Sequence, residues 1–128
     1  MTEDTRAGAD SPRQMSPPEA LVQAQLEAYN AQDIEAFLAC YHPECEFVRG
    51  SGEVELRGHA AFRQAYTGLW SRSPRLQARI LQRMVVGRHV IDLELMLHHA
   101  DGPRDPLVAL YETEGACIRR VRVITPRD

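Results

Sequence analysis

The sequence predicts an α+β domain in which about three helices cover one face of a curved antiparallel sheet. Apolar residues recur at helical spacing in residues 17–42, and this pattern is interrupted once, between residues 30 and 33. A further helical pattern occupies residues 59–70, after a short hairpin. From residue 76 onward the period changes to two, which is typical of strands. Local hairpins, with helices confined to the first half, favour helices on one side of the sheet.

The first helix has signals at both ends. Ser16 is suited to cap it, Pro17 to occupy its first position and Glu19 to complete a capping box. We expect the helix to end at Asn30-Ala31-Gln32, because asparagine tolerates the left-handed conformation that closes many helices. Its helically spaced positions are Leu21, Val22, Gln25, Leu26 and Tyr29.

A second short helix and a small hairpin follow. Asp33 is the expected cap, and His42-Pro43 stops the helix because proline cannot continue the hydrogen-bond ladder. Residues 46–49 and 54–56 are predicted to pair around a glycine-containing turn. Gly58 then precedes the third helix. The apolar face of the second helix holds Ile34, Phe37, Leu38 and Tyr41.

Four longer strands are predicted at residues 76–86, 89–99, 107–113 and 117–124. In the second of these, alternation places Asp92 and Glu94 on one face, with His98 on the same side. The opposite face holds the apolar residues Ile91, Leu93, Leu95 and Leu97, followed by His99. We therefore expect the apolar face to pack on the core and Asp92, Glu94 and Met96 to form an outward polar row.

The chain of 128 residues has the length of one domain, predicted at residues 16–128 after a polar, mobile leader at residues 1–15. No run of about 18 apolar residues and no secretory signal is present, so we expect a cytoplasmic protein that does not enter a membrane. The net charge is −3 and no basic cluster stands out, which argues against nucleic acid. All basic residues are arginine, which indicates a GC-rich bacterial genome.

Metal, redox and cofactor sites are not predicted. Cys40, Cys45 and Cys117 match neither a zinc spacing nor a disulfide framework. His98 and His99 are neighbours on a strand and point to opposite faces, so they do not form a metal pair. The turn at residues 50–52 lacks a phosphate-binding sequence.

Four motifs, in order, resemble those of the NTF2-like superfamily, and in particular its SnoaL-like and ketosteroid-isomerase-like domains. They lie at residues 28–33 (AYNAQD), 37–47, 56–62 and 109–121. The resemblance covers roughly residues 18–124. It implies a cone with an apolar pocket for a small hydrophobic ligand that is cyclic, aromatic, polyketide-like or steroid-like. It also implies a homodimer formed through sheet faces.

The resemblance does not extend to the catalytic residues of ketosteroid isomerases. Their tyrosine position falls on Gln25, their aspartate base on Arg49 and their protonated acid near Val108. A guanidinium stays protonated and cannot abstract a proton. The chain is therefore not expected to have ketosteroid isomerase activity.

Other residues remain candidates for chemistry or binding. Asp92, Glu94 or Arg49 would serve an isomerase, hydrolase or dehydratase if they faced the cone. Arg49, Arg120 and Arg122 either clamp an anionic ligand or pair with Glu46, Glu112 and Glu114. The expected pocket lining, with plain core packing as the alternative for each residue, is Tyr29, Tyr41, Phe47, Trp70 and Tyr111.

Three functions are compatible with these observations. The first is a pocket domain that binds a small molecule, and the second is an acid–base enzyme of the same fold. The third is a non-catalytic association module.

Overall fold

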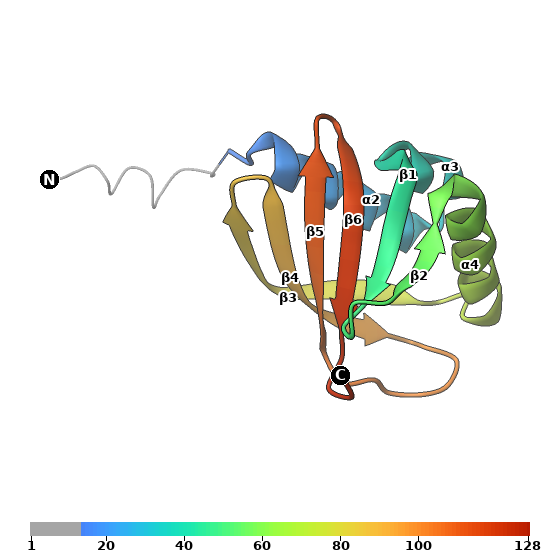
Figure 1. The fold of residues 1–128 in the computed structure, drawn as a ribbon. Coiled ribbons are helices and arrows are strands. Elements are labelled where there is room, and N and C mark those ends of the chain that lie inside the picture. Colours follow the sequence, from blue (N-terminus) through green and yellow to red (C-terminus); the bar gives the residue numbers. More distant parts are fainter. Residues whose placement is uncertain (1–13) are drawn as a thin grey trace, which may run out of the picture.

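The computed structural model describes residues 14–128, so the predicted leader lies almost wholly outside the described residues. Three helices and six strands follow in the predicted order (Figure 1). The helices are α2 (Pro17–Ala31), α3 (Ile34–Ala39) and α4 (Gly58–Arg72). The strands are β1 (Tyr41–Arg49), β2 (Val54–Arg57), β3 (Gln77–Val86), β4 (His89–Leu97), β5 (Leu107–Glu114) and β6 (Cys117–Ile124).

The six strands form one curved, unclosed sheet with the order β2-β1-β6-β5-β4-β3. All neighbours are antiparallel except β1 and β6, which run parallel. The predicted α+β class with a curved sheet is confirmed, and the sheet is mixed rather than wholly antiparallel. The strand β1 begins at Tyr41, before the predicted residue 46, because Tyr41 already pairs with Ile118 of β6.

The helices α2, α3 and α4 lie on the concave side of the sheet (Figure 1). The predicted caps are confirmed: the Ser16 side chain accepts from Glu19 N at 3.3 Å, and Asp33 accepts from Ala36 N at 3.1 Å. The left-handed residue that ends α2 is Gln32, with φ 55°, and not Asn30. Asn30 instead bonds both backbone groups of Ala78, which ties α2 to β3.

The core between helices and sheet is rich in aromatic side chains. Phe37 and Phe62 are 1% and 0% exposed, and full burial of such a ring contributes about 1.5–3 kcal/mol. The Trp70 ring packs against Tyr29 and Phe37 with centroids 5.6 and 5.8 Å apart. These contacts join all three helices into one body. None of the described helices is long and apolar enough to cross a membrane.

Two backbone irregularities change which side chains face inward. The β3–β4 register shifts between Ile80 and Gln82, which resets the alternation of β3 and turns Arg83 to the inner side. After β4, His98 adopts a left-handed conformation with φ 62°, so the strand ends before the predicted residue 99. Both irregularities position residues of the site described below.

Candidate functional site

A cavity of about 570 Å³ lies between the helices and the concave face of the sheet. Its exposed lining residues, among them Pro103, Arg104 and Asp105, mark the mouth, and its buried ones mark the floor. Apolar side chains from helices and strands make most of the wall. They include Leu26, Phe37, Leu56, Leu69, Met96 and Val123.

Four polar side chains form a continuous hydrogen-bond chain at the floor. The Tyr41 hydroxyl donates to Gln25 Oε1 at 3.1 Å, and Gln25 Nε2 donates to the Tyr111 hydroxyl at 3.1 Å. The Tyr111 hydroxyl in turn donates to Glu94 Oε2 at 3.1 Å. In each of the three bonds the donor lies on the side away from Glu94, so the Glu94 carboxyl group is the last acceptor of the hydrogen-bond chain.

The carboxyl groups of Asp92 and Glu94 face inward, so the expected outward polar row with Met96 is wrong. Asp92 is 0% exposed and Glu94 is 7% exposed, whereas the apolar residues on the other face of β4 are half-buried. Burial of Asp92 is offset by Arg83, whose Nε and Nη2 donate to its two oxygens at 2.6 and 2.9 Å. Gln23 accepts from a third nitrogen of the same guanidinium at 2.9 Å. The Asp92–Arg83 pair closes the floor and does not line the cavity.

The pKa of Glu94 is raised to about 7, first by burial and second by the nearby Asp92 carboxylate. The Tyr111 hydrogen bond and Arg83 act in the opposite direction. A carboxyl group with this pKa changes protonation near neutral pH, which is the property required of a general acid or base. Among Arg49, Asp92 and Glu94, only Glu94 lines the cavity.

Four of the five expected ligand-binding aromatics line the cavity: Tyr29, Tyr41, Phe47 and Tyr111. Trp70 does not. It is 5% exposed and lies behind Tyr29 and Phe37 in the aromatic core, so it packs the wall from outside.

The three candidate arginines Arg49, Arg120 and Arg122 are engaged with groups of the protein outside the cavity. Arg49 lies 3.1 Å from Glu55, and its side chain is 51% exposed. Arg120 contacts Glu46 at 3.0 Å and Glu112 at 3.5 Å, which is the cross-strand pairing considered for it. Arg122 donates to the Gly50 carbonyl. None of the three lines the cavity.

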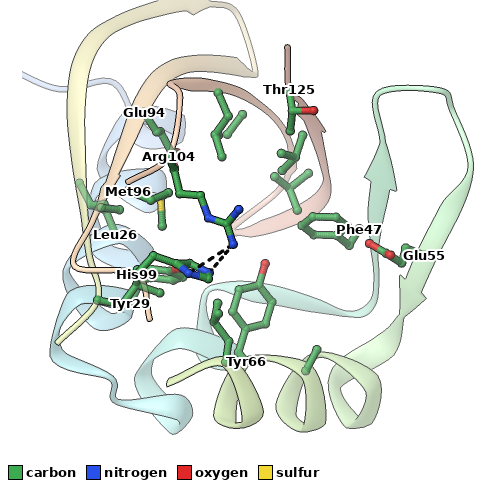
Figure 2. Close-up of a pocket in the computed structure, with 18 of the residues that line it drawn as sticks. Leu26, Tyr29, Phe47, Glu55, Tyr66, Glu94, Met96, His99, Arg104 and Thr125 are labelled. Carbon is green, nitrogen blue, oxygen red and sulfur yellow. Dashed lines mark hydrogen bonds between the residues drawn. The ribbon is translucent and has the colours of Figure 1, made fainter. Parts of the chain in front are cut away.

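Sequence reasoning missed three residues at the mouth: Tyr66, His99 and Arg104. His98, which alternation placed beside Glu94, is exposed, because its left-handed backbone ends the strand. The same turn brings His99 to the cavity instead (Figure 2). No local signal identifies a left-handed histidine, whereas Tyr66 lies within the helical pattern predicted at residues 59–70.

The described residues contain no group of three or more histidines, cysteines or acids that could hold a metal ion. Cys40, Cys45 and Cys117 are free thiols. The polar groups of the cavity are therefore the groups available for binding or proton transfer.

The sequence model of the SnoaL-like domain family matches residues 22–122. A search of curated proteins found no match. Among solved structures, this chain is similar to an uncharacterised cystatin-fold protein from Novosphingobium aromaticivorans. The two are 27% identical over 87% of this chain and 99% of that one, with a TM-score of 0.76.

Two more distant structures share the fold. An NTF2-like protein of unknown function from Cytophaga hutchinsonii is 15% identical over 91% of this chain and 96% of that one, with a TM-score of 0.72. TerC co-crystallised with polyporic acid is 18% identical over 88% of this chain and 93% of that one, with a TM-score of 0.72. The resemblance to the NTF2-like and SnoaL-like group is confirmed by these matches.

Proposed function

Because this chain belongs to the SnoaL-like domain family and holds a deep, largely apolar cavity, we propose that it binds a small cyclic or aromatic molecule there. The observation that carries the proposal is the 570 Å³ cavity, which is of the size and character of ligand sites. TerC, which shares the fold, was co-crystallised with polyporic acid. Polyketide-like and steroid-like molecules are the other ligand classes to test.

Thermal unfolding with a panel of aromatic, polyketide-like and steroid-like compounds tests this function. A ligand should raise the melting temperature of the wild type, because binding to the folded state alone stabilises it. Ala65→Phe, which fills the cavity from α4, should abolish the rise. Ala60→Phe, at an exposed position on the same helix, is the matched control. The absence of any shift across all three classes would exclude the proposal.

Ketosteroid isomerase activity is not part of the proposed function. The resemblance places Gln25 and Arg49 at the tyrosine and base positions, and Gln25 is engaged with Tyr41 and Tyr111. Arg49 does not line the cavity and pairs with Glu55. We expect no conversion of a β,γ-unsaturated steroid ketone to its conjugated isomer, measured by ultraviolet absorbance. Turnover that persists in the purified protein would contradict this expectation.

A second candidate function is acid–base catalysis of the isomerase, hydrolase or dehydratase type, and Glu94 favours it. Its carboxyl group lines the cavity and has a pKa of about 7. Asp92 would contribute only by raising the pKa of Glu94, because both of its own carboxylate oxygens accept hydrogen bonds from Arg83. Deuterium exchange into bound cyclic ketones, followed by NMR, tests this role. Exchange should occur with the wild type and stop in Glu94→Gln, and ligands that bind without exchange would count against it.

We further propose a homodimer formed through the outer face of the sheet. This face is apolar: it carries half-buried Leu93 and Leu95 on β4 and exposed Leu81, Met84 and Val86 on β3. A contiguous exposed apolar patch of this kind is typical of a protein–protein interface. Light scattering should give the mass of a dimer for the wild type and of a monomer for Leu93→Arg. A monomeric wild type would overturn the proposal.

A cytoplasmic location is also proposed. Three free thiols in one small domain fit a reducing compartment. Cell fractionation of the expressed protein tests this, and recovery with exported proteins would refute it.

A further inference from the structure

Two hydrogen-bond donors converge at the mouth of the cavity. Arg104, from the segment between β4 and β5, and Tyr66, from α4, point towards each other across the opening (Figure 2). Nη2 of Arg104 lies 3.2 Å from Asp101 Oδ2 and 3.3 Å from His99 Nδ1. Within residues 14–128, no group accepts a hydrogen bond from its Nη1 or Nε. The guanidinium is thus held in place by one nitrogen and keeps donors free for a ligand.

The Tyr66 hydroxyl is also free. It makes no hydrogen bond to another described residue, and its oxygen keeps some accessible surface although the residue is half-buried. Its ring is fixed by packing against Phe37, with centroids 4.7 Å apart, and against Phe62 at 5.7 Å. Burial raises the pKa of Tyr66 well above its ordinary value, so the group stays a neutral donor.

His99 adds a third donor to this end of the cavity. Its Nδ1 accepts from the Asp101 backbone N–H at 3.0 Å, so the proton of a neutral ring is on Nε2. Its side chain is 18% exposed, and the Arg104 guanidinium lies against the ring. Arg104, Tyr66 and His99 can therefore each donate a hydrogen bond at this end of the cavity.

The charges around the opening favour an anion. Arg72, Arg104 and Arg127 line the cavity, together with three acids: Glu55, Asp105 and, at the floor, Glu94. Glu55 is paired with Arg49, which lies outside the lining. Arg104 is likewise paired with Asp101, which also lies outside the lining. Arg72 and Arg127 against Asp105 still leave the lining charge at the mouth positive, and the Glu94 carboxyl group at the floor is uncharged below its pKa.

We propose that the ligand carries a carboxylate that binds between the Arg104 guanidinium and the Tyr66 hydroxyl, with its ring directed to the floor. The free Nη1 of Arg104 can donate a charge-assisted hydrogen bond to a carboxylate oxygen, and the Tyr66 phenol can donate a second. This inference rests on the proposed small-molecule function and specifies the chemistry of its ligand: an aromatic or cyclic acid, not a neutral hydrocarbon or an amine.

Matched ligand pairs and matched variants test the inference. Calorimetry would compare 2-naphthoate with 2-naphthamide, which has the same ring and no charge, on the wild type, Arg104→Gln and Tyr66→Phe. Arg79→Gln is the control, because it makes the same charge change at an exposed position outside the cavity. We expect the acid to bind more tightly than the amide, and Arg104→Gln to weaken the acid roughly tenfold to a hundredfold, as for loss of a charged hydrogen bond.

The possible outcomes separate the carboxylate inference from the proposed small-molecule function. Tyr66→Phe should weaken the acid by a smaller factor, and affinity of the amide should change little in either variant. Equal binding of acid and amide, or an equal loss in Arg79→Gln, would overturn the carboxylate inference and leave the proposed function standing. If neither ligand nor any compound of the wider panel binds the wild type, the proposed function itself fails.

Discussion

The Tyr111 hydroxyl donates to Glu94 Oε2 at 3.1 Å although the two residues are not paired across β4 and β5. The register pairs Tyr111 with Val90 and Glu94 with Leu107, so the tyrosine side chain runs along the inner surface of the sheet to reach the carboxyl group. The bond fixes one carboxyl oxygen. The other, Oε1, has no partner among the described residues and is left for proton exchange with the cavity.

Tyr111→Phe should raise the pKa of Glu94 above about 7, because the tyrosine hydrogen bond is one of the two interactions that lower it. The change should also destabilise the fold by about 1–3 kcal/mol, since Gln25 Nε2 loses its acceptor. Carbon-detected NMR titration of the Glu94 carboxyl measures the first effect and urea unfolding the second. Tyr66→Phe removes a hydroxyl that makes no internal hydrogen bond and is the control. A Glu94 pKa that stays unchanged or falls in Tyr111→Phe would contradict the prediction.

Glu94 should make the stability of the protein depend on pH. Its pKa rises from the ordinary 4.5 to about 7 on folding, so the folded state binds this proton more tightly than the unfolded state does. Its contribution is fully present below pH 4.5 and is lost as the pH rises through about 7. The loss amounts to about 3 kcal/mol at most.

Glu94→Gln removes this titration and keeps the shape of the side chain. Urea unfolding of both proteins across the pH range measures the difference. The wild type should lose stability relative to Glu94→Gln as the pH rises, and parallel curves for the two proteins would refute the assignment.

Arg83→Met should destabilise the protein by about 3–5 kcal/mol, because it leaves the fully buried Asp92 carboxylate without its partner. Replacement of both members, Arg83→Met with Asp92→Leu, should restore most of the loss. Thermal and urea unfolding give both values. Arg63→Gln, which breaks an exposed pair with Glu35, should have little effect. If the double variant is as unstable as Arg83→Met, the loss of stability does not come from the unpaired Asp92 carboxylate, and the prediction is wrong.

His98→Gly should leave the fold intact and stabilise it by up to about 1 kcal/mol, because only glycine adopts a φ of 62° without a penalty from Cβ. His98→Val should destabilise by about 1–2 kcal/mol. The two variants share the loss of the imidazole and differ in backbone freedom. Equal stabilities would mean that the left-handed turn before His99 imposes no strain.

The local elements could be predicted because their signals are local. Ser16 and Asp33 cap their helices through side chains three residues from the groups they bond. The inner face of β4 was predicted wrongly because alternation identifies two faces and not which one is buried. Leu93 and Leu95 looked like the core, yet Asp92 is the residue that is 0% exposed.

The polar floor depends on distant contacts that the sequence does not display. Asp92 is buried because Arg83 reaches it, and Arg83 faces inward only because the register of β3 shifts after Ile80. Gln25, which the sequence places on the inner face of the first helix without a partner, joins Tyr41 of β1 to Tyr111 of β5. His99 enters the cavity through the backbone conformation of His98. These features arise from register and backbone geometry, which residue patterns alone do not determine.

The parallel pairing of β1 with β6 constrains the order in which the fold can assemble. The strand β6 lies between β1 and β5, so the β1–β2 hairpin joins the rest of the sheet only through the last strand. During synthesis, the β1–β2 hairpin cannot pair with the rest of the sheet until the last strand, β6, has been made. Such long-range pairing slows folding. Until β6 arrives, the aromatic faces of α2 and α4 have no complete sheet to cover, and the nascent chain exposes them.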